Sequence, residues 1–162
     1  MKQHLNRTIT RIATETLQKL AFLFAFPDDG RTDEGPEPAV TGRVEFSGLF
    51  CGSMVVRIAA SALPELAANM LGSADDAEIA GEAQQDAFKE LTNVICGNVL
   101  PAIAGDQAEF LIGVPATLCA TDAPSLIRRN TAECVVRLAF DEGFCDVHLF
   151  IEGKLPELKI ED

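Results

Sequence analysis

The chain has 162 residues and a formal net charge of −12 at pH 7. This length fits a single domain, residues 1–162, with a hydrophobic core of its own. Because phosphates repel an acidic protein that lacks clustered basic residues, the charge argues against nucleic acid as a partner. No apolar run reaches the roughly 18 residues that a membrane span requires, so we expect a soluble protein with no membrane attachment.

The cysteines favour a reducing compartment. There are five, no two stand in a C-x-x-C pattern, and only two histidines accompany them. An odd number without metal-ligand spacing disfavours both a disulfide framework and a metal site. Since no secretion signal is recognisable, we expect a cytoplasmic protein whose cysteines are mostly small, buried, apolar side chains.

The first predicted element is an amphipathic helix over about residues 3–25, in which apolar residues recur every three or four positions. We interpret the apolar run LAFLFAF, residues 20–26, as the buried end of this helix. Residues 27–38 combine turn residues with five acids, which predicts a solvated acidic loop. This loop lacks the alternating ligands and central glycine of an EF-hand, so calcium binding is not expected.

Two strands are predicted over residues 42–46 and 54–59, joined by a segment that contains glycine. A helix begins near Ser61 and ends at Gly72. A second long helix follows over about residues 79–100. Each long helix is therefore followed by a hairpin, and this repetition suggests two related halves.

The last third of the chain is predicted to be mostly strand. A short strand at residues 109–113 precedes a loop over 115–130 and two longer strands at 132–140 and 144–152, and residues 153–162 form a tail. The two longer strands have near-continuous apolar stretches, so we expect part of the sheet to be covered on both faces, by helices or by a second subunit.

Polar residues follow one line along the second long helix. Asp86, Glu90 and Asn93 are spaced four and three residues apart, which places them on one side of a helix, and Gly97 falls on the same line. The apolar residues centre on a direction about 140° away. The helix therefore presents two carboxylates, a carboxamide and a bare glycine outward. Pro101 should kink or end it, because proline lacks the N–H that continues a helix.

This pattern suits catalysis by positioning. An asparagine donates and accepts hydrogen bonds at once, so Asn93 can hold a water in line with a reacting group, although it cannot act as a base. Glu90 offers a fixed negative charge to a lysine of a partner. Such help suffices for a reactive bond such as an acyl phosphate. The alternative is that these residues only solvate an exposed helix face.

The pattern and its surroundings resemble the CheC/CheX/FliY family of bacterial chemotaxis phosphatases. That family's motif is Asp or Ser, three residues, Glu, two residues and Asn, with a proline about twenty-two residues later. Asp86, Glu90 and Asn93 match in register, and Pro115 follows after 21 intervening residues. The segments GRVEFSGLFCGSMVVRIA, LPELAANMLG and NVICGN resemble the family's hairpin, second helix and continuation after the asparagine. The similarity covers nearly the whole chain.

The resemblance implies an α+β fold, with long helices packed on an antiparallel sheet of two related halves. It also implies hydrolysis of the aspartyl phosphate on a phosphorylated CheY-type response regulator, with Asn93 orienting the water, Glu90 pairing with the receiver's lysine and Asp86 in support. The catalytic Mg²⁺ belongs to the receiver, so the chain needs no cofactor of its own. Gly97 is our own addition to the partner-binding residues, because a missing side chain lets a partner's backbone approach.

The first long helix departs from the pattern of two-site family members. Arg11, Glu15 and Gln18 stand where an acid or serine, a glutamate and an asparagine would be. A single site in the second half is the CheX pattern, and that branch is usually a homodimer; whether the Glu15/Gln18 site is active stays open. We expect Asn98 to satisfy backbone groups near the proline break, and His148 to be a packed or surface residue.

Two non-catalytic alternatives use the same fold. One is a scaffold like the flagellar switch proteins of the FliM type, and the other is an adaptor that binds a receiver without hydrolysis. The intact Glu90 and Asn93 pair favours the phosphatase, since a scaffold has no physical need for it. The sequence leaves open which response regulator is the target and whether the output is flagellar.

Overall fold

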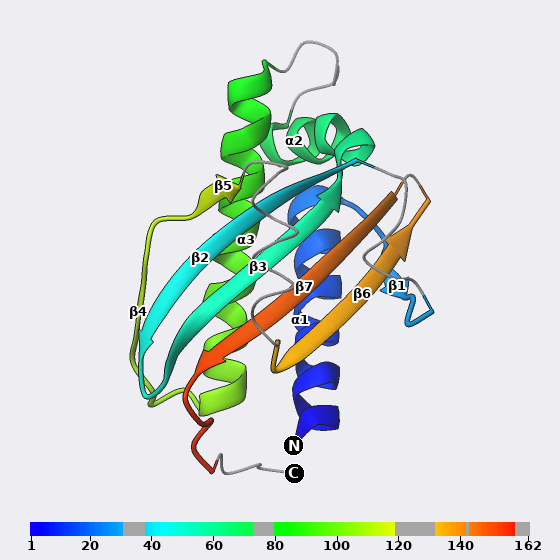
Figure 1. Cartoon of the computed structure of the whole chain (residues 1–162). Coiled ribbons are helices and arrows are strands. Elements are labelled where there is room, and N and C mark those ends of the chain that lie inside the picture. The colour runs from blue at the N-terminus through cyan, green and yellow to red at the C-terminus, as the bar shows by residue number, and fades with distance from the viewer. Residues whose placement is uncertain (31–37, 73–79, 119–131, 142, 158–162) are drawn as a thin grey trace.

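A computed structural model describes residues 1–30, 38–72, 80–118, 132–141 and 143–157. Three α-helices and one antiparallel sheet of long and short strands make up the regular structure of this part of the chain, so the predicted α+β architecture is confirmed (Figure 1). The helices are α1 (Lys2–Ala21), α2 (Leu63–Leu71) and α3 (Gly81–Ala104), with the 3₁₀ turn η1 (Ala60–Ala62) before α2. The strands are β1 (Phe26–Pro27), β2 (Ala39–Gly48), β3 (Cys51–Ala59), β4 (Phe110–Ile112), β5 (Ala116–Leu118), β6 (Cys134–Phe140) and β7 (Gly143–Glu152).

The sheet has the order β1-β6-β7-β3-β2-β4, and β5 also pairs with β2. The hairpins β2–β3 and β6–β7 therefore flank the centre of the sheet, where β3 pairs antiparallel with β7. A long helix precedes each hairpin, α1 the first and α3 the second. This arrangement is the one expected of two related halves.

The core lies between the sheet and the helices, which all cover the same face (Figure 1). Alternate residues of the central strands contribute to it, among them Met54 and Ile58 of β3 and Val147 of β7. The intervening residues of β7 are also buried: Asp146 is 0% exposed and His148 1% exposed. β7 is therefore buried on both faces, as its near-continuous apolar sequence predicts.

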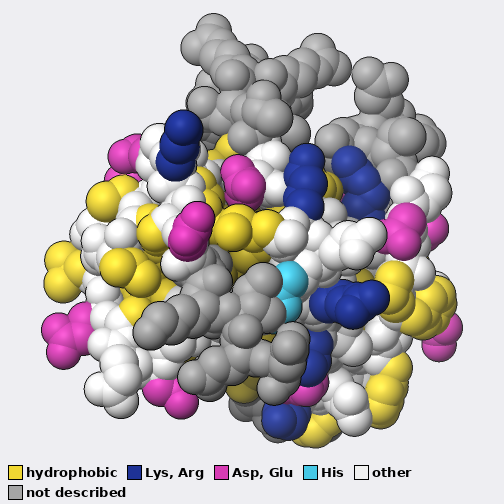
Figure 2. Space-filling view, turned by 90° about the horizontal axis from the view of Figure 1, so that it is seen from below, with side chains coloured by type: hydrophobic (Ala, Val, Ile, Leu, Met, Phe, Trp, Pro, Cys, Tyr) yellow, Lys and Arg dark blue, Asp and Glu magenta, His cyan; other side chains and the backbone are white. Residues whose placement is uncertain are grey.

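The start of α1 and the end of β7 lie at one end of the molecule (Figure 1). Figure 2 views this end and shows apolar, acidic and basic side chains interspersed over it.

At the opposite end, the Asn69 side chain of α2 donates to the carbonyl of Ala21 across 2.6 Å, which holds α2 against the last turn of α1. Among the described residues, no helix is long and apolar enough to cross a membrane.

The first helix ends earlier than its sequence predicts. The helix stops at Ala21, and Phe22 adopts a left-handed conformation with φ 52°. The N–H groups of Phe22 and Leu23 donate to the carbonyls of Gln18 and Leu17, and the first of these bonds is that of an αL C-cap. The prediction that the run over residues 20–26 is a buried helix end is therefore wrong beyond Ala21. Pro27 disfavours a helical conformation in the residue before it. Here the chain becomes extended, and Phe26 and Pro27 pair with β6.

The second long helix instead runs further than predicted. It continues through Pro101 to Ala104 and ends before Gly105, which has φ 94°. Proline removes one helical hydrogen bond, but Val99, Leu100 and Ile103 are all buried in the core. Burial of these side chains outweighs the missing bond, so Pro101 does not end the helix.

Other boundaries also differ from prediction. Strands β2 and β3 are longer than residues 42–46 and 54–59, because their pairing extends from Ala39 opposite Ala59 to Phe46 opposite Gly52. The predicted loop over residues 115–130 begins with a strand, since Ala116–Leu118 pairs with β2. Most of the rest of that loop lies outside the described residues.

The placement of α3 depends on a glycine in β2. Gly42 is buried, and a Cβ atom built on it would lie 2.9 Å from the Phe88 ring and 3.0 Å from Thr92 Oγ1. Phe88 and Thr92 are both 0% exposed, and the Thr92 hydroxyl donates to the Phe88 carbonyl. The helix therefore rests directly on the strand backbone, at a distance that only glycine allows.

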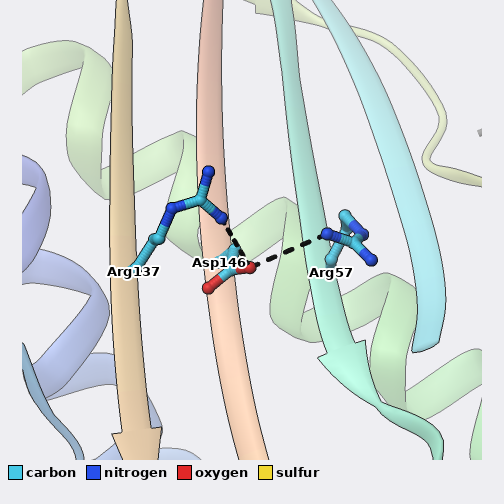
Figure 3. A network of polar contacts seen from close by, with 3 residues as sticks. All are labelled: Arg57, Arg137 and Asp146. Atoms are coloured by element: carbon cyan, nitrogen blue, oxygen red, sulfur yellow. Dashed lines mark hydrogen bonds and ion pairs between the residues drawn. The ribbon is translucent and has the colours of Figure 1, made fainter. Parts of the chain in front are cut away.

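A buried carboxylate bridges the central strands on the face away from the core. Arg57, Asp146 and Arg137 stand opposite one another on β3, β7 and β6. The Asp146 Oδ2 atom lies 3.8 Å from Arg57 Nη1 and 3.4 Å from Arg137 Nη1 (Figure 3). Because Asp146 is fully buried and both arginines are mostly so, the charges compensate one another in a poorly solvated place.

Replacing Gly42 with alanine should lower the free energy of unfolding by about 1–3 kcal/mol, the usual cost of overpacking. The added methyl group would push Phe88 and Thr92, which are enclosed by the core. Urea denaturation followed by circular dichroism measures the change. The control is Gly81→Ala at the start of α3, where a Cβ meets nothing within 4 Å. Equal stability of the two variants would contradict close contact between α3 and β2.

Replacing Asp146 with asparagine should lower the free energy of unfolding by about 3 kcal/mol, since removing one partner leaves buried guanidinium charges uncompensated. The matched control is Glu45→Gln, which breaks the 2.9 Å ion pair with Arg43 where Glu45 is 68% exposed. That exposed pair should contribute less than about 1 kcal/mol, despite its shorter distance. Chemical denaturation of both variants tests the contrast, and a control as destabilising as Asp146→Asn would refute it.

Candidate functional site on the outer face of the second long helix

The predicted stripe lies on the outer side of α3. The buried face of this helix consists of Ala87, Phe88, Leu91, Thr92, Ile95, Cys96, Val99, Leu100 and Ile103. Between them, Asp86 and Glu90 are exposed, and Asn93 and Gly97 are partly exposed. These four residues, here called the exposed stripe, face away from the core as their spacing predicts. The structure therefore brings together all four predicted site residues.

The polar groups of the exposed stripe are not used inside the protein. Within the described residues, the structure records no side-chain hydrogen bond or ion pair for Asp86, Glu90 or Asn93. A carboxamide in this state has both its donors and its acceptor available. The site therefore offers an outside partner two negative charges and one group that can orient a water molecule.

Gly97 borders a second element. A Cβ built on it would lie 3.8 Å from Ile112 Cδ1 of β4, an ordinary van der Waals contact. Internal packing would therefore accept an alanine here, so no contact within the described structure requires a glycine. The motif's proline, Pro115, lies between β4 and β5, on the segment that follows Ile112.

The corresponding positions of α1 differ in their electrostatics. Arg11 Nη1 lies 3.6 Å from Glu15 Oε1, one helical turn along, and both side chains are about half exposed. Gln18 is exposed. Glu15 thus forms an ion pair with a cation on its own helix, whereas no ion pair of Glu90 is recorded within the described residues. The three positions on α1 thus correspond in spacing to those on α3, but the side chains at these positions present different charges.

Asn98 does not have the role that its sequence position predicts. It is exposed, and the structure records no hydrogen bond from its side chain to the backbone near Pro101 within the described residues. The structural interpretation of Asn98 is therefore wrong. The residue instead lines a groove between α1 and α3, because the two helices do not close over this part of their contact.

His148 is a packed residue, as predicted. It is 1% exposed, and its ring stacks on Phe150 with the ring centroids 6.3 Å apart. It lies in β7 at the centre of the sheet, so it belongs to the sheet's own packing and not to the exposed stripe.

The cysteines near the site are not nucleophiles. Cys96 is adjacent to Gly97 in sequence, but burial raises the pKa of its thiol to about 12, so it stays protonated at neutral pH. Cys134 and Cys145 are buried as predicted, Cys51 is exposed, and Cys119 lies outside the described residues. No group of three or more histidine, cysteine or acidic residues able to hold a metal ion is present in the described part of the chain.

Comparison with solved structures shows the fold. A CheX chemotaxis protein from Vibrio vulnificus is 17% identical, with a TM-score of 0.69 over 91% of this chain and 96% of the other. A CheX protein from Desulfovibrio desulfuricans is 16% identical, with a TM-score of 0.67 over 91% and 99%. The matching chain in a complex of CheX with CheY, BeF3 and Mg²⁺ from Borrelia burgdorferi is 17% identical, with a TM-score of 0.68 over 91% of this chain and 97% of the other.

A search of curated protein sequences returned no match. The sequence model of the family described as chemotaxis phosphatase CheX matches residues 40–141. The match begins in β2 and ends just after β6, so it includes all of α3 and the exposed stripe. Because the family model and the fold agree over most of the chain, the protein belongs to the CheX family of chemotaxis phosphatases.

Proposed function

We propose that this protein hydrolyses the aspartyl phosphate of a CheY-type response regulator. One observation carries the proposal. In a chain of the CheX family, Glu90 and Asn93 lie together on the outer face of α3, and neither side chain has a recorded hydrogen bond or ion pair within the described residues. A relative of the same fold forms a complex with CheY, which supports a receiver as the partner.

In the proposed reaction, Asn93 holds a water molecule in line with the phosphorus atom. The water oxygen forms a bond to phosphorus while the bond from phosphorus to the receiver's aspartate oxygen breaks. The aspartate leaves as a carboxylate, and inorganic phosphate takes up the oxygen and the protons of the water. Asparagine does not accept a proton here, so its contribution is alignment alone. An acyl phosphate needs little more, because its carboxylate is a good leaving group.

Glu90 has a different proposed role. Its carboxylate pairs with a lysine of the receiver and fixes the orientation of the two proteins, and Asp86, one turn earlier, supports the same contact. The Mg²⁺ that neutralises charge on the phosphoryl group is the receiver's, so the chain needs no cofactor of its own. Every chemical group that reacts thus belongs to the receiver or to water, and α3 supplies geometry.

We further propose that residues 1–162 act as one domain in the cytoplasm, and that the protein is a homodimer. The resemblance to the CheX branch supports this proposal. The competing function is a scaffold or adaptor that binds a receiver without hydrolysis, since uncompensated polar groups also suit binding. Measurement of phosphate release separates the two.

Asn93→Ala should reduce the rate of receiver dephosphorylation by about 10²–10³, the usual cost of losing one preorganised polar contact. Binding of the receiver should change little, because the alanine leaves Glu90 in place. Phosphate release from a phosphorylated CheY-type receiver measures the rate, with Gln18→Ala as the matched carboxamide control on α1. If the native chain binds several receivers but accelerates none, the protein is an adaptor or scaffold.

Substitutions of Gly97 should separate internal packing from partner contact. Gly97→Ala should raise the free energy of unfolding by about 1 kcal/mol, since alanine favours helix and fits beside Ile112. Gly97→Leu should weaken receiver binding at least about tenfold, because its side chain would occupy the space needed by the partner. Titration with a phosphorylated receiver measures binding, and Gly81→Leu on the same helix is the control. Normal binding by Gly97→Leu would remove this glycine from the interface.

A further inference from the structure

A groove of about 420 Å³ separates α1 from α3 beside the exposed stripe. The two helices pack side by side and run in opposite directions (Figure 1). The α1 side of the groove consists of Ile12, Glu15, Thr16, Lys19 and Leu20, and the α3 side consists of Val94 and Asn98. The groove therefore joins elements from both halves of the molecule.

The α3 side of this groove is continuous with the proposed catalytic residues. Glu90, Val94 and Asn98 follow one another at intervals of four residues, so they form a single line along the helix. The line starts at Glu90 and leads into the groove. Because α1 and α3 are antiparallel, Lys19 lies toward the Glu90 end of the groove and Ile12 toward the Asn98 end. The groove thus adjoins the side of α3 that carries Glu90 and Asn93, and Lys19 lies on its α1 rim.

The groove combines an apolar floor with charged rims. Ile12 is 8% and Thr16 5% exposed, whereas Lys19 and Asn98 are exposed. Glu15 is compensated by Arg11 at 3.6 Å. For Lys19, the structure records no ion pair within the described residues. Lys19 is thus an exposed cation without a recorded ion pair on the groove rim, in a chain with a net charge of −12.

We propose that this groove is a second part of the receiver-docking surface, in which Lys19 binds an acidic group of the phosphorylated receiver and an apolar side chain of the receiver fills the floor. The inference rests on the proposed function. A phosphorylated receiver carries negative charge at the site that Asn93 must reach, so a strongly acidic protein repels it. A cation on the rim of the adjoining groove offsets that repulsion where the two surfaces meet.

A second copy of this chain fits the groove less well. In a two-fold contact the same surface meets itself, so Lys19 of one copy would need an acid from the same groove of the other. The acid available in the groove is Glu15, and Arg11 already compensates it. The charge pattern therefore favours a partner that brings its own carboxylate.

Lys19 is a positioning and specificity residue and does not contact the reacting atoms. Changing it should therefore alter the receiver concentration at half-maximal rate and leave the maximal rate unchanged. Lys19→Glu should raise that concentration about 3- to 10-fold, and Lys19→Gln about 2-fold, the scale expected for one exposed charge contact. Added salt should raise it for the native chain and raise it less for Lys19→Gln.

Two further variants complete the test. Arg7→Glu makes the same charge change at another exposed position of α1 outside the groove, and it should change the half-saturating concentration less than 2-fold. Asn98→Phe fills the groove from an exposed helix position, so the protein should fold normally and need at least about 5-fold more receiver. All variants are compared by steady-state phosphate release over a range of phosphorylated receiver concentrations.

Unchanged half-saturation in Lys19→Glu and Asn98→Phe, with a normal maximal rate, would overturn the docking proposal and leave the phosphatase intact. A fall in the maximal rate alone would also overturn it, because Lys19 would then act in the chemical step. A changed molar mass of Lys19→Glu in light scattering would assign the groove to contacts between copies of this chain. Absence of activity in the native chain would instead refute the proposed function, so the two failures are distinguishable.

Discussion

The contact between Phe88 and the backbone of β2 at Gly42 sets the geometry of the site. With no side chain at Gly42, the ring lies against the strand, and Thr92 packs beside it one turn later. A helix fixed at two points along one face cannot rotate about its axis. The direction opposite to those contacts is then determined, and it is the direction in which Glu90 and Asn93 point. A catalytic group that works by alignment depends on this kind of fixation.

The two halves of the molecule share a framework but differ in the charge on their helices. β3 and β7 meet at the centre of the sheet, where Asp146 compensates arginines from both hairpins. Each hairpin follows a long helix on the same face of the sheet. On α1, however, Arg11 compensates Glu15, and a longer carboxamide stands at Gln18. Within the described residues, the same backbone arrangement thus presents a paired glutamate on α1 and an unpaired one on α3.

The parts of the structure that sequence predicts well are those governed by local periodicity. The spacing of Asp86, Glu90 and Asn93 fixes their common face through the helical repeat alone, and Gly72 ends α2 as its chemistry indicates. The predicted element boundaries are wrong where contacts between residues far apart in the sequence determine them. Pairing of β1 with β6 shortens α1, and burial of Ile103 carries α3 past Pro101. The exposure of Asn98 depends on how closely α1 approaches α3, which no local pattern contains.

The proposed catalysis by alignment constrains few positions, so such a chain can diverge in sequence while keeping its fold. Structures of the same fold are only 16–17% identical to it, because a core tolerates many exchanges of apolar residues that conserve volume. A carboxamide that acts by its position cannot be exchanged in this way for a side chain of another length. A glutamine places its amide about 1.5 Å further from the backbone than an asparagine does, and a displacement of about 1 Å can reduce a rate by two orders of magnitude. In the proposed mechanism, Gln18 on α1 is therefore not equivalent to Asn93 on α3, even though both side chains end in the same chemical group.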